Sequence, residues 1–353
     1  MTEPRLDPHF WSGKRVLVTG HTGFKGAWLC HWLLRLGAQV SGFSLPPVSN
    51  PNLFHLLNLE GRMASHLGDL RHIDQVEHII RSVQPDIVLH LAAQALVRPS
   101  YEDPLSTFES NVMGTTHLLE ALRISHLPEV CLVATTDKVY RNLEQGKPFR
   151  EDDPLGGHDP YSASKAATEI VISSYRQSFF EHTKSKLISV RAGNAIGGGD
   201  WSVDRIIPDA IRAWTQGDVL AVRRPNAIRP WQHVLEPLLG YLFLCQSANQ
   251  TRHASYNIGP SVHDMMTVGE LIQNAQAMFG CGEVEFSANE NGPHEAGLLQ
   301  LDVGRIDEEF GLQPQLTSQQ ALRYTIGWYK AFYDNKDAIN LCDQDIDAFL
   351  GAT

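Results

Sequence analysis

The sequence predicts an α/β fold: a doubly wound parallel sheet followed by a smaller C-terminal α/β domain. Two observations lead to this prediction. Short apolar, β-branched runs alternate with helical patterns through roughly the first 195 residues, and this regularity breaks down after about residue 197. Alternating strands and helices form crossover units, which build parallel sheets. We expect one domain over residues 1–195 and a second over residues 196–353, with a cleft between them and some crossing back of the chain.

The strands and helices of the first domain can be placed from their patterns. The expected strands cover residues 15–20, 39–43, 86–93, 129–136 and 187–194, and the expected helices cover residues 26–37, 72–85, 110–124 and 161–180. The strands are short, mainly apolar runs, as in parallel strands that are buried on both faces. We expect seven or so strands in total. Beyond residue 197, irregular glycine- and proline-rich segments alternate with helical patterns such as residues 267–280.

Composition excludes several classes of function. The 353-residue chain has a formal net charge of -11 and carries no basic run, so we expect no nucleic-acid partner. Its five scattered cysteines form no C-x-x-C pair, and its 16 histidines show no ligand spacing, so we expect no metal. No apolar run approaches the length of a membrane span, and the N-terminus does not resemble a secretory signal. We therefore expect a cytoplasmic protein without a membrane partner.

A glycine-rich turn follows the first expected strand. Gly20, Gly23 and Gly26 have the spacing G-x-x-G-x-x-G and lead directly into a helix, with Phe24 and Lys25 between the last two glycines. Such a turn lets the backbone approach a pyrophosphate at the N-terminus of a helix, as in Rossmann dinucleotide-binding domains. Lys25 either adds a cation for the phosphates or is simply a solvated loop lysine.

The second expected strand leaves the choice of dinucleotide open. The segment "VSGFSLPP" contains neither an acid for an adenosine ribose 2'-hydroxyl nor an arginine for a 2'-phosphate. The residues alone therefore do not decide between NAD and NADP.

Tyr161 and Lys165 form a Y-x-x-x-K motif on an expected helix. Side chains four residues apart lie on the same helix face, so the lysine is one turn from the phenol. The lysine cation favours the phenolate and can also hold a nicotinamide ribose. Tyr161 would then serve as a base near neutral pH.

The stretch "TTDKVY" follows the apolar run of the strand at residues 129–136. It places Asp137 next to Lys138 at the carboxyl end of a parallel strand, where open α/β sheets bind their ligands. An isolated Asp-Lys pair would more often be a solvated loop pair. Its meaning therefore depends on the glycine turn and the Y-x-x-x-K helix around it.

These motifs together resemble the extended short-chain dehydrogenase/reductase family, and within it the nucleotide-sugar 4,6-dehydratases, most closely the branch that acts on CDP-glucose. The resemblance extends over nearly the whole chain. It is carried by the strings "VLVTGHTGFKGAWL", "HLAAQALVRPSY", "NVMGT", "TTDKVY", "YSASK", "VRAGNAIGGGDWSVDRIIPD" and "RPWQHVLEPLLGY". It implies a Rossmann domain that binds NAD, a C-terminal domain that binds the nucleotide sugar, and a role in deoxysugar biosynthesis, such as that of lipopolysaccharide O-antigen.

The resemblance also implies a reaction and assigns roles to residues. Tyr161 would remove the proton of the sugar 4-hydroxyl while NAD takes the C4 hydride; water would then leave, and the hydride would return to C6. Thr136 would hydrogen-bond O4, and Asp137, with a raised pKa, would protonate the departing 6-hydroxyl. Many relatives have Asp-Glu after the threonine, whereas this chain has Asp137-Lys138. Lys138 would be either a neutral base or a cation that stabilises the enolate.

Further binding residues are implied by the matching motifs. For the cofactor these are Asp69 and Leu70 near the adenine, and Leu91, Ala92 and Ala93 beside the nicotinamide. For the pyrophosphate of the sugar nucleotide they are Asn194, Arg205 and Arg229, with Arg98, His233 and His294 equally consistent with packing or surface roles. The family usually forms homodimers through two helices per subunit, which correspond here to residues 111–126 and 161–180.

Three other functions are compatible with parts of the pattern. A nucleotide-sugar 4-epimerase shares the glycine turn, Tyr161 and Lys165 but needs no acid for a leaving hydroxyl, so Asp137 after Thr136 favours dehydration. A non-catalytic dinucleotide sensor would be expected to lack Tyr161 or Lys165. A reductase that uses free NADPH is disfavoured by the dehydratase-like strings. The residues do not identify the nucleobase, so TDP-, UDP- and GDP-sugars remain alternatives, as does a tetramer instead of a dimer.

Overall fold

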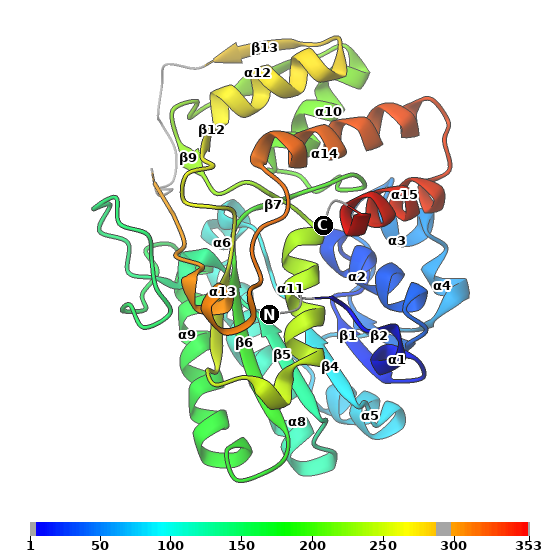
Figure 1. The fold of residues 1–353 in the computed structure, drawn as a ribbon, viewed down its shortest axis with the longest axis vertical. Helices are drawn as coiled ribbons and strands as arrows, with labels where there is room; N and C mark the ends of the chain where they lie inside the picture. Colours follow the sequence, from blue (N-terminus) through cyan, green and yellow to red (C-terminus); the bar gives the residue numbers. More distant parts are fainter. Residues whose placement is uncertain (1–4, 287–297, 352–353) are drawn as a thin grey trace.

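A seven-stranded, all-parallel sheet forms the centre of the computed structural model, which describes residues 5–286 and 298–351 (Figure 1). Its strands, in spatial order, are β11 (Ser255–Ile258), β6 (Lys186–Ala192), β5 (Val130–Ala134), β4 (Ile87–His90), β1 (Arg15–Thr19), β2 (Gln39–Ser44) and β3 (Ala64–Leu67). The order reverses direction between β1 and β4, as it does in doubly wound sheets. The predicted fold class is confirmed.

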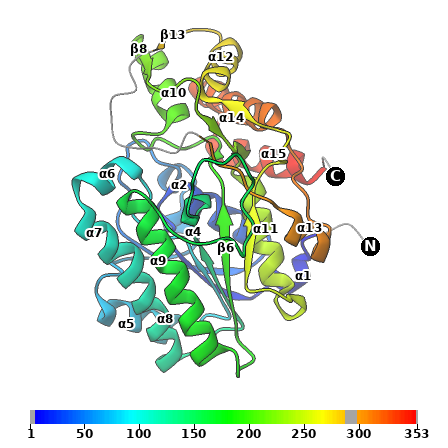
Figure 2. The same cartoon turned by 90° about the vertical axis from the view of Figure 1, so that its left-hand side faces the viewer.

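Helices cover both faces of the sheet. One face is covered by α5 (Ile73–Val83), α8 (Gly114–Ser125) and α9 (Pro160–Tyr175), and the other by α2 (Phe24–Arg35) and α11 (Leu235–Gln246) (Figure 2). Successive side chains of a strand point to opposite faces. Accordingly, Val16 and Val18 pack into the core beside α2 and α11, whereas Leu17 packs beside α5 and α8. Burial on both faces explains why the inner strands are mainly apolar.

The C-terminal part of the chain extends beyond the carboxyl ends of the strands (Figure 1). Its helices α10 (Ile206–Gln216), α12 (Val268–Phe279) and α14 (Ser318–Tyr333) lie there, whereas α13 (Gly304–Phe310) packs beside β11 and α15 (Ala338–Gly351) packs beside α2 and α3. Three strand pairs join its loops: β7 (Ala195–Ile196) with β10 (Gln232–His233), β8 (Val219–Val222) with β13 (Glu283–Phe286), and β9 (Ile228–Arg229) with β12 (Met266–Thr267). Because α11 and β11 return to the main body, the domain division at 195/196 stays a prediction.

Short elements complete the described fold. They are α1 (Pro8–Trp11), α3 (Leu53–Leu56), α4 (Leu59–Arg62), α6 (Val97–Glu102), α7 (Pro104–Phe108), two π-helical turns at η1 (Glu109–Met113) and η3 (Arg176–Phe180), and two 3-10 turns at η2 (Asp137–Val139) and η4 (Ala248–Gln250). No helix within the described ranges is both long and apolar enough to cross a bilayer.

The two edge strands were not placed from the sequence. β3 has the sequence "ASHL", and most of its side chains are exposed, so it lacks an apolar run. β11 has only four residues, "SYNI", and it lies far along the chain from the other strands. It is fixed by parallel pairing with β6, for example Tyr256 opposite Val190, which is a non-local contact.

Glu236 is a buried carboxylate that joins α11 to the segment before α14. Its Oε1 accepts hydrogen bonds from the backbone N–H groups of Gln315 at 2.9 Å and Leu316 at 2.6 Å. Burial raises the pKa of Glu236 to about 7, although the two N–H donors oppose this rise. The neutral acid is therefore favoured in the folded protein relative to the unfolded chain.

We expect this group to make the protein less stable as the pH rises. Because its pKa is raised on folding, the folded state binds more protons than the unfolded chain between pH 4.5 and about 7, so stability falls across that window and levels off above it. Glu236→Gln keeps an oxygen acceptor and removes the titration. Urea unfolding should show the wild type losing on the order of 2 kcal/mol relative to Glu236→Gln between pH 5 and pH 8. A constant difference between the two proteins over this range would contradict the assignment.

Candidate active site

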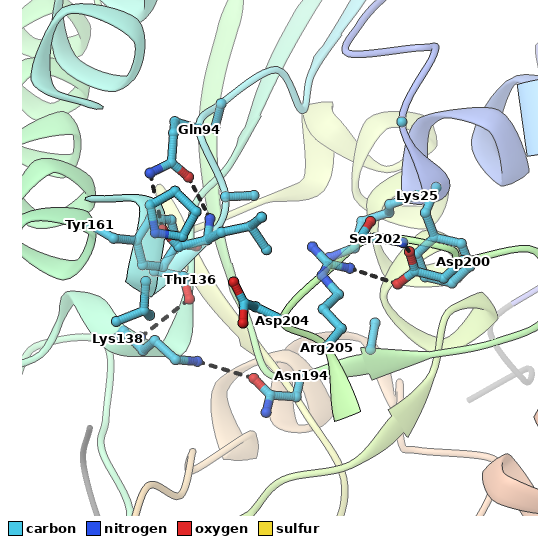
Figure 3. A pocket seen from close by; sticks show the side chains of 18 of the residues that line it. Lys25, Gln94, Thr136, Lys138, Tyr161, Asn194, Asp200, Ser202, Asp204 and Arg205 are labelled. Atoms are coloured by element: carbon cyan, nitrogen blue, oxygen red, sulfur yellow. Dashed lines mark hydrogen bonds and ion pairs between the residues drawn. The ribbon is translucent and has the colours of Figure 1, made fainter. Parts of the chain in front are cut away.

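A cavity of about 1210 Å³ lies at the carboxyl ends of the central strands. Its wall combines the turns after β1, β4, β5 and β6 with residues 199–202, 204–209 and 220–224 of the C-terminal part, which include the start of α10 and the end of β8. Figure 3 shows side chains from these segments converging on one space. The cavity therefore occupies the position where open parallel sheets bind ligands.

The predicted glycine turn lines one end of this cavity. Gly20 has a φ of 77°, which favours glycine, and a Cβ on Gly26 would lie 2.1 Å from the carbonyl oxygen of Gly20. Gly23 is the N-cap of α2 and supplies no side-chain cap, so the helix N-terminus is left to other acceptors. This open cradle at a helix N-terminus fits the pyrophosphate of a dinucleotide.

Phe24 and Lys25 of the same turn also line the cavity. The Lys25 ammonium lies 5.8 Å from the ring centroid of Tyr241. Burial, together with the nearby cation Arg205, lowers the pKa of Lys25 to about 8. A half-buried cation of this kind would gain from a bound phosphate, which supports the phosphate-binding alternative for Lys25 over the solvated one.

The remaining predicted cofactor residues line the same cavity. They are Asp69 and Leu70 after β3, and Leu91, Ala92 and Ala93 after β4. The Asp69 carboxylate is paired with Arg71 at 2.7 Å, an arginine that the sequence reasoning did not select. Ser44 ends β2, and its hydroxyl is 2.9 Å from that of Thr22. Small hydroxyl groups thus lie at the end of β2, where many NAD-binding Rossmann domains carry an acidic residue for the adenosine ribose.

Tyr161 and Lys165 lie on α9, which begins with Pro160 after the N-cap Asp159. Both side chains are buried and line the cavity. Burial raises the pKa of Tyr161 to about 12, opposed by a side-chain hydrogen bond with Thr136, and burial lowers the pKa of Lys165 to about 8. The Lys165 ammonium donates to the carbonyl oxygen of Ala134 at 3.3 Å.

The segment Thr136–Lys138 forms a hydrogen-bonded chain beside Tyr161. Thr136 Oγ1 donates to Asp137 Oδ1 at 2.9 Å, and Lys138 Nζ reaches the same carboxylate oxygen at 2.9 Å. The Lys138 ammonium also donates to Asn194 Oδ1 at 3.0 Å, as Figure 3 shows. Thr136 therefore links Tyr161, the residue predicted for oxidation, to Asp137 and Lys138, the residues predicted for dehydration.

Asp137 differs from its neighbours in exposure. Its side chain is 0% exposed, and it lies behind Thr136 and Lys138, which line the cavity. Among the described residues, no hydrogen-bond partner reaches Asp137 Oδ2. The sequence suggested an acid at the wall, whereas the structure places this carboxyl one layer deeper, where it contacts the cavity through its two neighbours.

The structure places the predicted sugar-nucleotide residues as follows. Asn194, Arg205, Arg229 and Arg98 all line the cavity. Arg205 pairs with Asp200 at 3.0 Å, and Arg98 lies 3.6 Å from Asp204. His233 is fully buried and does not line the cavity, which fits its packing alternative. His294 lies outside the described residues.

Sequence reasoning missed several polar residues of the site. The wall also carries Gln94, Asp200, Asp204, Arg223 and Arg224. Asp204 has a φ of 59° and lies 3.6 Å from Arg98 and 3.9 Å from Arg223. These residues come from irregular loops, so no periodic pattern marks them. The string "GGGDWSVDRIIPD" contained two of them, but only Arg205 was selected from it.

A second missed group lies directly behind the wall. Glu169 on α9 and Arg191 on β6 form a buried ion pair at 3.0 Å. Glu169 follows Lys165 by four residues, so the same helix spacing that linked Tyr161 to Lys165 could have identified it.

The arrangement supports proton transfer and hydride chemistry at a sugar-like substrate. It offers a phenol and a lysine for an alcohol proton, a carboxyl and a second lysine next to them, and several arginines for an anionic group. Within residues 5–286 and 298–351, no group of three His, Cys, Asp or Glu side chains is placed to hold a metal ion.

Comparison with protein families and known sequences gives a consistent result. The family model described as GDP-mannose 4,6 dehydratase matches residues 17–325. The chain is 41% identical to a CDP-glucose 4,6-dehydratase of Salmonella typhimurium, with 99% of both chains covered. It is 26% identical to a UDP-glucose 4-epimerase of Mycoplasma pneumoniae, over 91% of this chain and 98% of that protein.

Solved structures with the same fold include nucleotide-sugar enzymes. A Thermus thermophilus UDP-glucose 4-epimerase in complex with NAD is 26% identical, with a TM-score of 0.77 over 90% of this chain and 99% of that one. A dTDP-glucose 4,6-dehydratase of Streptomyces venezuelae shares the fold with a TM-score of 0.77 at 24% identity, covering 92% of this chain and 99% of that one.

Proposed function

This chain belongs to the nucleotide-sugar 4,6-dehydratases of the extended short-chain dehydrogenase/reductase family, and we propose that it converts CDP-glucose to CDP-4-keto-6-deoxyglucose and water with internally recycled NAD. The enzyme is thus a lyase. The observation that carries the proposal is the buried Asp137 carboxyl, which Thr136 joins to Tyr161. An epimerase has no leaving hydroxyl and no need for an acid at this position. The identity of the relative from Salmonella typhimurium supports CDP as the nucleotide.

The cofactor residues fit NAD. The open glycine cradle suits its pyrophosphate, and the half-buried Lys25 side chain lines the same cavity, where its cation is available to the phosphates. When bound, NAD would accept the hydride of the sugar C4 and later return it to C6. The turns after β3 and β4 would hold the adenine and nicotinamide sides, through Asp69 and Leu70 and through residues 91–93 respectively.

Tyr161 would take the proton of the sugar 4-hydroxyl. Its pKa of about 12 makes the phenolate a strong base but a rare one at neutral pH, because burial disfavours the charged form. The side-chain hydrogen bond with Thr136 and the Arg205 cation both lower the pKa of Tyr161 and so favour the phenolate. Lys165, one helical turn away, would orient the reacting groups and contribute its own charge.

Asp137 and Lys138 would carry out the elimination of water. Oxidation at C4 acidifies the C5 hydrogen, and the 6-hydroxyl then needs a proton to leave. Asp137 would supply that proton. Lys138 lines the cavity and lies 2.9 Å from the Asp137 carboxylate, so it would assist at C5, either as a neutral base or as a cation beside the enolate.

Arginines of the C-terminal part would bind the diphosphate of the substrate. Arg205 and Arg229 are the principal candidates, together with Asn194 and with Arg98 on α6. Arginine suits this role because its planar guanidinium binds phosphate oxygens with paired hydrogen bonds. The chain is acidic as a whole, with a formal net charge of -11, so this local concentration of arginine provides the positive charge that the ligand requires.

The same proposal includes a homodimer formed through a bundle of α8 and α9. Large apolar side chains are exposed on these helices and the adjoining π-helical turns: Met113, Ile124, Ile170 and Phe179, with exposures of 42–63%. Burial of such side chains in a partner helix pair would be favourable.

We further propose a cytoplasmic location, a role in deoxysugar biosynthesis such as that of lipopolysaccharide O-antigen, and separate roles for the two parts of the chain, one binding NAD and the other binding the sugar nucleotide.

The substrate proposal is tested by incubating the purified enzyme with CDP-, TDP-, UDP- and GDP-glucose. We expect CDP-glucose alone to lose one molecule of water, with NAD needed only in catalytic amount. The product mass measures the loss of water, and the absorbance of the reduced cofactor measures whether NAD is consumed. A product of unchanged mass with inverted C4 would indicate an epimerase, and reduced cofactor accumulating with product would contradict recycling. Dehydration of another glucose nucleotide in preference to CDP-glucose would show that cytosine is the wrong nucleobase for the substrate.

The roles of Asp137 and Lys138 in "TTDKVY" can be distinguished because each residue would act in a different step of the reaction. Asp137→Asn should still oxidise C4 and exchange the C5 proton but should lose water about 10²–10⁴-fold more slowly, because the acid is missing. Lys138→Met should oxidise C4 but suppress deuterium incorporation at C5. Mass spectrometry of sugar recovered from deuterated water measures both steps.

The exposed Lys336→Met is the matched control for loss of a lysine charge, and we expect it to behave as the wild type. If Lys138→Met also retained wild-type labelling and turnover, Lys138 would have no catalytic role. The C5 proton would then pass to Asp137 or to water.

A further inference from the structure

The buried carboxylate of Glu169 lies behind the active-site wall and binds three side chains, of which Thr135 lines the cavity. Its Oε1 accepts the hydroxyl of Thr135 at 2.5 Å, and its Oε2 accepts Ser189 at 2.9 Å and Arg191 at 3.0 Å. Only 4% of Glu169 is exposed. A buried carboxylate is costly unless it is paired and hydrogen-bonded, and this one is satisfied on both oxygens.

The contact with Thr135 is the one that reaches the chemistry. Thr135 is the first residue after β5 and directly precedes Thr136 and Asp137. Its backbone N–H donates to the carbonyl oxygen of Val190 at 2.8 Å, and its hydroxyl lies 3.3 Å from the same oxygen, so β6 holds its main chain while Glu169 is the closer partner of its side chain. The turn that carries Thr136 and Asp137 is thereby attached at its first residue.

Glu169 lies on the same helix as the oxidation residues. Tyr161, Lys165 and Glu169 are spaced four residues apart on α9, so they lie along one helix face. The helix thus holds the Tyr161 phenol in the cavity and, two turns later, holds the start of the Thr136–Asp137 segment. One carboxylate connects the two halves of the proposed reaction mechanically.

The far side of the Glu169 pair is anchored in the sheet. Arg191 on β6 donates to the hydroxyl of Tyr140 at 3.0 Å and to the carbonyl oxygen of Glu151 at 2.8 Å. Tyr140 in turn donates to Asn257 on β11 at 2.6 Å. Because these contacts fix the guanidinium from several directions, Glu169 is held in a single position and can act as a rigid support.

We propose that Glu169 is a positioning residue for the dehydration reaction: through Thr135 it sets the placement of Thr136 and Asp137 relative to Tyr161. This inference rests on the proposed function and adds a residue to it. Glu169 itself lies behind the wall and does not line the cavity. A small displacement of reacting groups costs much of the advantage of an oriented site, so losing this support should slow turnover more than it weakens substrate binding.

Glu169 also has an electrostatic effect on Lys165. Among the groups that face the Lys165 ammonium, Glu169 on the same helix is the anion that raises its pKa, against the larger lowering by burial. Lys25 approaches from α2, and His90 approaches from β4 with a pKa of about 3, so it is neutral at working pH. Without the carboxylate, Lys165 should lose its proton at lower pH.

The test compares Glu169→Gln and Thr135→Val with the wild type on CDP-glucose. Thr135→Val removes the hydroxyl that Glu169 holds but leaves the buried Glu169–Arg191 pair intact, so it remains informative if Glu169→Gln fails to fold. We expect kcat to fall roughly 10- to 100-fold in both variants with KM within about twofold. Thr135→Ser should restore kcat. Thr325→Val is a matched control on α14, where the hydroxyl bonds only the Ala321 carbonyl among the described residues.

The pH profile separates positioning from a merely structural role. In Glu169→Gln, the alkaline limb of kcat should move to lower pH, whereas in Thr135→Val it should stay in place. Wild-type kcat in Thr135→Val, or a lowered melting temperature with an unchanged kcat and pH profile in Glu169→Gln, would overturn the proposal. If the wild type itself does not dehydrate CDP-glucose, the proposed function fails instead, so the two failures are distinguishable.

Discussion

The hydrogen bond from Thr136 to Asp137, 2.9 Å long, is the interaction on which the account of this site depends. Thr136 also bonds the phenol of Tyr161, so one hydroxyl joins the residue proposed for oxidation to the acid proposed for dehydration. Because the chain continues through Lys138 to Asn194, the proton donors and acceptors of both steps form one connected set. A sugar bound against this set would present C4 and C6 to neighbouring groups.

Holding these groups together is energetically demanding. Asp137 has no exposure, and burial opposes the charged forms of both Tyr161 and Lys165. The structure offsets this cost by pairing: Lys138 with Asp137, and Arg191 with Glu169. The Asp137 and Glu169 carboxylates are therefore buried but each is paired with a cation, and in such surroundings hydrogen bonds and charges are stronger than in water.

Much of this arrangement could be predicted from local sequence. The inner strands are mainly apolar because they are buried on both faces, and the glycine turn is recognisable because Gly26 must pack against the backbone of Gly20. Tyr161 and Lys165 follow from helix spacing. The strands β3 and β11 were missed because they are short edge strands held by non-local pairing.

The depth of Asp137 and the contacts of Asp204 were not predictable in this way. Both depend on which loops of the C-terminal part fold over the sheet, and no periodic pattern encodes that. Glu169 was predictable only in part. Its place on the helix face of Tyr161 and Lys165 follows from the sequence, but its partners do not, because Thr135 follows β5 and Ser189 and Arg191 lie on β6. Local pattern thus identified the glycine turn and the Tyr161–Lys165 helix, whereas tertiary contacts decided the loop residues of the wall and the layer behind it.

In the proposed reaction, one hydride leaves C4 and returns to C6 of the same sugar without exchange with free cofactor. This transfer is tested most directly with CDP-glucose carrying deuterium at C4, by locating the label in the product. We expect the deuterium at C6 of the 4-keto-6-deoxy sugar and none in the free cofactor or in the solvent. Loss of the label to solvent, its accumulation in free reduced cofactor, or its return to C4 in an epimerised sugar would contradict the account.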